Sequence, residues 1–245
     1  MTEIFNSTEL RRELHPLAEL GLNTKNTAQY VLDHLEKIGV EAHRVGNTNG
    51  VLGVIDSGVP GPTVMLRADM DALPFEVDGK KTAIHACGHD GHTAMLLGLA
   101  KLLSAQRAAF SGEARLFFQH AEELPPGGAV ELVHAGAADG VDAMLGLHLS
   151  TNWPTGVFGV RAGVLTAAVD RFDITVKGKG AHCSFPEQGV DAIVTAAQLI
   201  LALQTISARR VAATDPVIVS ICQANAGTAY NILPDEMTLT GAVRS

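Results

Sequence analysis

Histidine, cysteine and aspartate concentrate in residues 85–92, which read His-Ala-Cys-Gly-His-Asp-Gly-His. If this segment is extended, Cys87 and His89 point to the same side, where a thiolate and an imidazole can bind one metal ion or two neighbouring ions. Asp90 is expected at the N-cap of a following helix, because apolar side chains recur at helical spacing after it. The alternative is a buried cysteine among hydrogen-bonded histidines.

A second group of polar side chains follows an apolar segment predicted as a strand, residues 63–69. Asp69 and Asp71 are two positions apart at its carboxyl end. A carboxylate there could orient an imidazole ligand by accepting the hydrogen bond of its second ring nitrogen. The alternative is a pair of turn-capping aspartates before Pro74.

Two further strands also end close to groups that could bind metal or transfer protons. Glu122 and Glu123 come shortly after a strand predicted over 114–119, and adjacent side chains there would point to opposite sides. One glutamate could bind metal while its neighbour activates a water molecule, which suits hydrolysis. Taken alone, the glutamates could equally be solvated, and His148, at the end of a strand predicted over 143–149, could be an ordinary hydrogen-bonded histidine.

Taken together, these groups favour a metal site. Four predicted strands end at, or are followed at once by, the aspartate pair, the Cys87 and His89 pair, the glutamate pair and His148. In a parallel or mixed sheet such strand ends converge on one edge, where open α/β sheets place their sites.

The remaining sequence pattern predicts helices and strands around these groups, and the order of these elements changes after residue 156. In the first part we expect helices over 7–20, 24–38 and 129–135 and a strand over 51–56. In the second part we expect a long helix over 189–209 and strands over 168–177, 217–223 and 236–243, which make half of an α+β sandwich.

Composition narrows the classes of function. The chain has 245 residues, 47% of them hydrophobic, and a formal net charge of −8. This charge argues against binding to nucleic acid or to an anionic membrane surface. The three scattered cysteines and an N-terminus without an apolar stretch favour a reducing, cytoplasmic location. The apolar segment 192–206 is expected to be too short and too polar to span a bilayer.

The motifs together resemble the co-catalytic metallopeptidase family of aminoacylases, hippurate hydrolases and carboxypeptidases that act on N-acyl amino acids. The closest resemblance is to its amidohydrolase branch, which hydrolyses hippurate and auxin–amino acid conjugates. It covers nearly the whole chain and is carried by the segments 67–74 (RADMDALP), 85–103 (beginning HACGHDGH), 119–129 (QHAEELPPGGA), 141–149, 178–186 and 231–244.

The resemblance implies a role for each of several residues. The metal pair would be bound by Cys87, His89, Glu123 and His148. Glu122 would be the general base that deprotonates the attacking water and later protonates the leaving amine, and Asp71 would orient a histidine ligand. In the second part His182 would polarise the scissile carbonyl, often across a dimer interface in relatives, and Asn231 and Arg244 would hold the α-carboxylate of the substrate.

The implied fold is α/β: a mixed-sheet metallohydrolase catalytic domain over residues 1–160, with an inserted α+β lid or dimerisation domain over 164–245. Both would be incomplete, because relatives continue past this C-terminus and supply one more histidine ligand. Two departures accompany this truncation. Segment 75–84 is shorter than expected, and His120 stands where many members have proline.

The expected function is metal-dependent hydrolysis of the amide bond of an N-acyl amino acid or a small peptide-like substrate. The expected cofactors are two divalent ions, zinc or manganese first and cobalt or nickel next, and the expected partners are the small substrate and a second copy bound through the lid. One rival is an inactive fragment or degenerate paralogue that binds metal or a partner without turnover. The other is a cysteine hydrolase with Cys87 as nucleophile.

Overall fold

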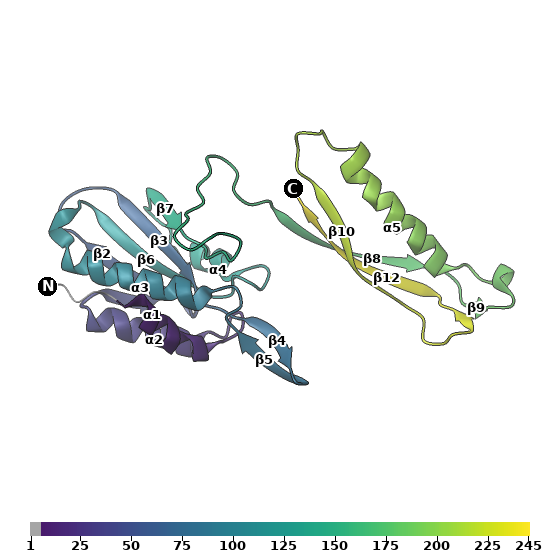
Figure 1. Ribbon diagram of the computed structural model, residues 1–245, viewed down its shortest axis with the longest axis horizontal. Helices are drawn as coiled ribbons and strands as arrows, with labels where there is room; N and C mark the ends of the chain where they lie inside the picture. Colours follow the sequence, from purple (N-terminus) through teal and green to yellow (C-terminus); the bar gives the residue numbers. More distant parts are fainter. Residues whose placement is uncertain (1–5) are drawn as a thin grey trace. The chain divides into compact units, whose positions relative to one another are not determined.

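The computed structural model describes residues 6–245, and these residues divide between Thr155 and Gly156 into two compact units (Figure 1). Each unit has its own sheet and its own hydrophobic core. The first unit carries the groups predicted to bind metal, and the second carries His182, Asn231 and Arg244.

The first unit is built on a mixed five-stranded sheet with the strand order β1-β2-β6-β3-β7. β3 runs parallel to both β6 and β7, whereas β2 is antiparallel to β6 and to β1. The carboxyl ends of β3, β6 and β7 therefore meet at one edge. This arrangement confirms the predicted α/β fold with a mixed sheet. The strands are β1 Glu41–Arg44, β2 Val51–Asp56, β3 Thr63–Asp69, β6 Glu113–Gln119 and β7 Ala143–Gly146.

Both faces of this sheet are covered. On one face, the helices α2 and α3 bury Leu35 and Leu97 against Leu116 and Phe118 of β6. On the other face, α4 buries Leu132 against Phe117. Neighbouring side chains of β6 thus enter opposite cores, as the alternation of a strand requires. The helices are α1 Ser7–Leu14, η1 His15–Leu17, α2 Lys25–Lys37, α3 His89–Ala105, η2 Arg107–Ala109 and α4 Gly128–His134.

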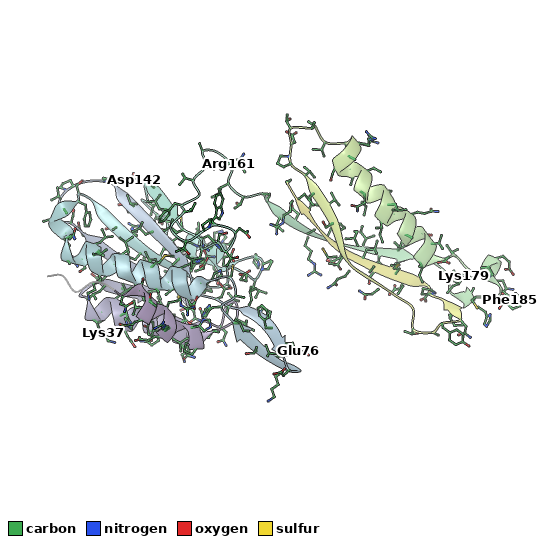
Figure 2. All side chains as sticks on the ribbon, viewed as in Figure 1. Lys37, Glu76, Asp142, Arg161, Lys179 and Phe185 are labelled. Carbon is green, nitrogen blue, oxygen red and sulfur yellow. The ribbon has the colours of Figure 1, made fainter. Side chains whose placement is uncertain are left out.

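The structure differs from the sequence prediction in several elements of this unit. The first helix stops at Leu14 and continues only as a 3-10 turn, because Pro16 cannot donate a backbone hydrogen bond. β1 was not predicted. Nor was β4, Leu73–Val77. The strand predicted before the histidine-rich stretch is present as β5, Lys80–Ile84, but it pairs with β4 in a separate two-stranded hairpin that includes Glu76 (Figure 2). The strand before the histidine-rich stretch is therefore not part of the main sheet.

The second unit packs one long helix on a three-stranded antiparallel sheet of order β10-β12-β8. Ala192 and Ala196 of the helix α5 bury against Met237 and Leu239 of β12. A short pair of strands, β9 and β11, was not predicted and lies within the segments 178–186 and 231–235. The elements are β8 Val169–Lys177, β9 Ala181–His182, η3 Pro186–Gln188, α5 Ala192–Arg209, β10 Ile218–Ala226, β11 Ile232–Leu233 and β12 Glu236–Arg244.

Helix α5 has the length and apolar composition of a membrane-spanning helix, and it is the one such helix among residues 6–245. The expectation that this segment is too short and too polar is therefore wrong by these two criteria. Such a match is weak, because the core helix of a soluble protein passes the same test. In this structure α5 packs one face on the sheet of its own unit.

Candidate metal centre

The predicted site residues of the first unit gather at the carboxyl edge of its sheet. Asp69 is the last residue of β3, Glu122 and Glu123 follow β6, and His148 lies two residues beyond the end of β7. Cys87 and His89 reach the same place from a different element, since His89 is the first residue of α3. The structure thus brings the carboxylates, the thiol and the imidazoles together.

The backbone around Cys87 is a turn, and the expectation of an extended segment is wrong. Residues 86 and 87 form the turn, Gly88 adopts a left-handed conformation with φ of +87°, and α3 begins at once with His89. Glycine suits this position because it has no Cβ to oppose a positive φ. Gly88, and not Asp90, is therefore the N-cap residue. Asp90 is buried inside the first turn, and its carboxylate is hydrogen-bonded to the side chains of His15 and Arg11 in the N-terminal segment.

Two overlapping groups of side chains could hold metal ions. Cys87, His89 and His148 have donor atoms within 4.8 Å of one another, and so do His89, Glu122 and Glu123. The Cys87 Sγ lies 3.4 Å from His148 Nε2, and His89 Nε2 lies 3.6 Å from Glu123 Oε1. His89 belongs to both groups, so the two groups adjoin each other.

Two of the possible ligand atoms in these groups lack hydrogen-bond partners among the described residues. His89 Nε2 and Glu123 Oε1 are buried and have no hydrogen-bond partner among the described residues. Leaving buried polar atoms unpaired costs about 1–3 kcal/mol each, unless a ligand satisfies them. A thiolate, imidazoles and a carboxylate form a donor set suited to zinc and neighbouring divalent transition metals. The residues present therefore fit divalent metal.

Asp71 contacts both His89 and Glu123. Its Oδ1 lies 3.3 Å from His89 Nδ1, and its Oδ2 accepts the backbone N–H of Glu123 at 3.0 Å. Burial alone would lower the pKa of His89, but the hydrogen bond with Asp71 and the charges of Asp69 and Glu123 outweigh it and raise that pKa. The position of Asp71 is that of a carboxylate that orients a histidine ligand, leaving Nε2 free.

The glutamate pair is presented by a tightly held backbone. Ala121 is buried and has a φ of +50°, which is uncommon for a residue other than glycine, and it turns the chain immediately before Glu122. Burial and the neighbouring Glu123 carboxylate raise the pKa of Glu122. A raised carboxyl pKa suits a group that must both accept and release a proton near neutral pH.

Cys87 has the properties of a protonated thiol in the absence of metal. Burial, a hydrogen bond with Glu123 and the surrounding carboxylates raise the pKa of Cys87 to about 12. A nucleophilic cysteine requires the opposite shift, because the thiolate is the reactive form. This environment disfavours the cysteine hydrolase and is compatible with a ligand that loses its proton when a cation binds.

The second unit separates its three predicted site residues into two places. His182 of β9 pairs with Ile232, and the backbone carbonyl of Asn231 accepts the N–H of Cys183, so His182 and Asn231 lie close together. Arg244 is at the far end of β12, which has nine residues, so roughly 26 Å separates the two ends of this strand. One copy of this unit cannot place Asn231 and Arg244 on the same carboxylate.

Two buried residues beside the centre were not assigned a definite role from the sequence. His92 is one turn along α3 from His89, and its Nδ1 lies 2.6 Å from Asp69 Oδ1. Asp69 also accepts a hydrogen bond from Arg67 at 2.8 Å. Burial alone would raise the pKa of Asp69, but the His92 hydrogen bond and the Arg67 charge lower it to about 2. The three-residue spacing of the two histidines was the available signal, but it puts them on one face of a helix only because α3 begins at His89 and not after Asp90.

Comparison with known proteins places the chain in a family. Residues 65–234 match the model of Peptidase family M20/M25/M40. The chain is 46% identical over 243 residues to N-acyl-L-amino acid amidohydrolase of Geobacillus stearothermophilus, covering 96% of this chain and 65% of that protein. It is 43% identical over 246 residues to thermostable carboxypeptidase 1 of Saccharolobus solfataricus, covering 97% of this chain and 63% of that protein.

A solved structure of the same family also matches the chain. The YxeP protein of Bacillus subtilis, described as a dinuclear metal-binding peptidase of the M20 family, is 36% identical and superimposes with a TM-score of 0.78. The match covers 98% of this chain and 63% of that one. The chain thus spans somewhat less than two thirds of the length of the relatives it matches.

Proposed function

This chain belongs to Peptidase family M20/M25/M40, and from that premise we propose that it hydrolyses the amide bond of N-acyl amino acids or small peptide-like substrates with the help of two divalent metal ions. The observation that carries this proposal is the pair of buried, unsatisfied atoms His89 Nε2 and Glu123 Oε1, which belong to the groups of donor atoms formed with Cys87, His148 and Glu122. The substrate class follows the name of the Geobacillus relative, which is an N-acyl-L-amino acid amidohydrolase.

Each residue of the centre has a proposed part. Cys87, His89, Glu123 and His148 hold the ions, and Asp71 orients His89 through the contact with its Nδ1. When bound, the ions polarise the scissile carbonyl and lower the pKa of water. Glu122 accepts the proton of the attacking water and passes it to the nitrogen of the leaving amine. The donor set favours zinc or manganese, followed by cobalt or nickel.

We assign the second unit, residues 156–245, to the recognition of substrate and to the pairing of two copies. His182 is exposed, as a side chain that contacts a carbonyl outside its own unit must be. The strands β8 and β10 are the two edges of its sheet and offer unpaired backbone groups. Since Asn231 and Arg244 lie at opposite ends of the unit, binding of one α-carboxylate by both requires residues of two copies.

The test is hydrolysis of a small panel, N-acetyl amino acids and hippurate, before and after removal of metal by a chelator. We expect activity that the chelator abolishes and a divalent ion restores. Glu122→Gln should lower kcat by about two to four orders of magnitude while metal content stays unchanged. The matched control Glu36→Gln, on the exposed face of α2, should leave kcat unchanged. Metal content without hydrolysis of any panel member would favour the non-catalytic alternative, and activity blocked by thiol alkylation but not by chelation would favour the cysteine hydrolase.

A further inference from the structure

His148 stands on the least buried part of the centre. It follows β7, an edge strand whose residues are all exposed, and residues 142–150 are exposed throughout. Of the other predicted ligands, Cys87 lies in the half-buried turn before α3, His89 is buried at the start of α3, and Glu123 belongs to the segment held by Asp71. A ligand on an exposed segment must be fixed by contacts of its own if it is to meet the ions at a defined position.

The backbone of Leu149 supplies these contacts. The N–H of Leu149 donates to His92 Nε2 at 2.8 Å, and the carbonyl of Leu149 accepts from His148 Nδ1 at 2.6 Å. The carbonyl is an acceptor only, so the proton of a neutral His148 ring is on Nδ1. Its Nε2 then carries the lone pair, which lies within hydrogen-bond distance of Cys87 Sγ, at 3.4 Å.

Hydrogen bonds at both ring nitrogens hold His92 in place. Because Leu149 N–H is a donor, His92 Nε2 must be the acceptor, and the ring proton is on Nδ1, which donates to Asp69 Oδ1 at 2.6 Å. Asp69 is held in turn by Arg67. The side chains of His92 and Asp69 are each 1% exposed. A continuous chain of hydrogen bonds therefore runs from Arg67 to the ring of His148.

Packing holds the same segment in place. A Cβ on Gly91 would lie 2.6 Å from Leu149 Cδ1, closer than any carbon contact allows, so the side chain of Leu149 occupies the space that this glycine leaves free. The rings of His92 and His148 meet edge to face at 4.6 Å between centroids. The segment that carries His148 thus packs on the first turn of α3.

A different reading would make Asp69, His89 and His92 a further metal site, since their donor atoms also lie within 4.8 Å of one another. Both ring nitrogens of His92 already have hydrogen-bond partners, one in Asp69 and one in the Leu149 backbone. A metal ion on His92 would have to break one of these bonds. His89 Nε2, by contrast, has no hydrogen-bond partner among the described residues, and the Asp69 and Glu123 carboxylates lie 3.6 Å from it.

We propose that His92 is a positioning residue, which sets the orientation and the tautomer of the metal ligand His148 through the backbone of Leu149. The proposal rests on the proposed function in one respect, namely that His148 binds metal. His92 itself would touch neither metal nor substrate. The loss of a residue that orients a metal ligand typically weakens metal binding about 10- to 100-fold.

Two substitutions separate the two hydrogen bonds of His92. His92→Asn places an amide near Nδ1 and can still donate to Asp69, but it offers no acceptor to Leu149. His92→Gln extends to the position of Nε2 and can accept from Leu149, but it loses the bond to Asp69. We expect His92→Asn to weaken metal binding about 10- to 100-fold and His92→Gln to retain most of the wild-type affinity. A purely structural role would make the two variants equally weak.

The first readout needs no metal. In long-range nitrogen–proton spectra of the metal-free chain labelled in histidine, we expect His148 in the Nδ1–H tautomer in the wild type and in His92→Gln. We expect a tautomer mixture and faster amide exchange of Leu149 in His92→Asn. A wild-type His148 protonated on Nε2, or an unchanged spectrum in His92→Asn, would overturn the proposal.

The second readout is the visible spectrum of the chain loaded with cobalt. We expect His92→Asn to keep the thiolate charge-transfer band of Cys87 while the visible bands weaken toward those of His148→Ala. Cobalt spectra and affinities of His92→Asn identical to the wild type would refute the positioning role. If the wild type binds no cobalt while the tautomers are as expected, the failure lies in the proposed metal function and not in the placement of His148.

Discussion

Cys87 couples metal binding to pH. In the metal-free chain burial, Glu123 and the other nearby carboxylates raise its pKa to about 12, so the thiol carries a proton at neutral pH, and a cation must displace that proton to reach the sulfur. Metal affinity should therefore rise with pH, by about tenfold per pH unit for this one proton.

Calorimetric titration with zinc in buffers of different ionisation enthalpy measures the protons released. We expect Cys87→Ser to release about one proton fewer per bound metal pair than the wild type. The exposed Cys183→Ser is the matched control and should release as many protons as the wild type. Equal release from wild type and Cys87→Ser would remove Cys87 from the ligand set.

Asp69 should contribute to stability in a way that depends on pH. Burial opposes its charge, but the His92 hydrogen bond and the Arg67 charge lower its pKa from 3.8 to about 2. Since the folded pKa lies below the unfolded one, the carboxylate stabilises the fold above pH 4, and this contribution is lost as the pH falls toward 2. Its size is roughly 2 kcal/mol.

We expect Asp69→Asn to lower the free energy of unfolding of the metal-free chain by roughly 2 kcal/mol at pH 7. The difference from the wild type should shrink below pH 4. Urea unfolding at a series of pH values measures it, with Asp170→Asn on the exposed part of β8 as control. A difference that stays constant down to pH 3 would show that the charge of Asp69 is not the cause.

At the scale of elements, the start of α3 must satisfy two demands that conflict at Gly91. Alanine is the better helix former, by about 1 kcal/mol, but a Cβ at this position would lie 2.6 Å from Leu149 Cδ1. We expect Gly91→Ala to weaken metal binding modestly, because the side chain of Leu149 must shift and its backbone carbonyl orients the ring of His148. A competition titration against a metal-binding indicator measures the effect.

The double variant Gly91→Ala with Leu149→Ala removes the clash and should recover part of the lost affinity. Such recovery is the mark of two residues in contact. Wild-type affinity in Gly91→Ala alone would mean that the packing of Leu149 does not determine the position of His148.

The elements also show what the sequence could predict. Strands β3 and β6 were placed correctly because their apolar patterns are strong and their side chains pack in the cores of the sheet. β7 was found from its apolar residues, but it is an exposed edge strand that ends at Gly146, three residues before the predicted end. The backbone at Cys87 was predicted wrongly, because the spacing of two ligands does not reveal whether they lie on a strand or on a turn followed by a helix. Gly88, with its positive φ, decides this, and a glycine alone is compatible with either conformation.

Other features depend on long-range contacts. The β4–β5 hairpin is mostly exposed, so no buried face leaves a pattern in its sequence. The separation of Asn231 from Arg244 follows from the straight course of β12, which the resemblance of the segment 231–244 did not reveal. The role of His92 required knowing that Leu149 packs on α3, a contact between residues 57 positions apart.

At the scale of the whole molecule, the two units divide the work proposed for the chain. All four predicted metal ligands lie in the first unit. Its two hydrophobic cores are formed by the five-stranded sheet and the helices of this unit. The second unit has a separate core between α5 and its own sheet. Metal binding and the folding of each unit should therefore survive a break in the chain between them, whereas hydrolysis requires both if His182 contacts the substrate.

Residues 147–168 connect β7, the last strand of the first unit, to β8 without any helix or strand. Arg161, labelled in Figure 2, lies within this exposed stretch. Proteases require an extended, accessible segment, which folded elements do not offer. We expect brief treatment with trypsin to cut first after Arg161, as mass spectrometry would show, and Arg161→Gln to abolish this early cut. The larger fragment should keep bound zinc with Cys87, His89, Glu123 and His148. An early cut at the exposed Lys80 or Arg210 with Arg161 intact, or loss of zinc on cleavage, would contradict the independence of the two units.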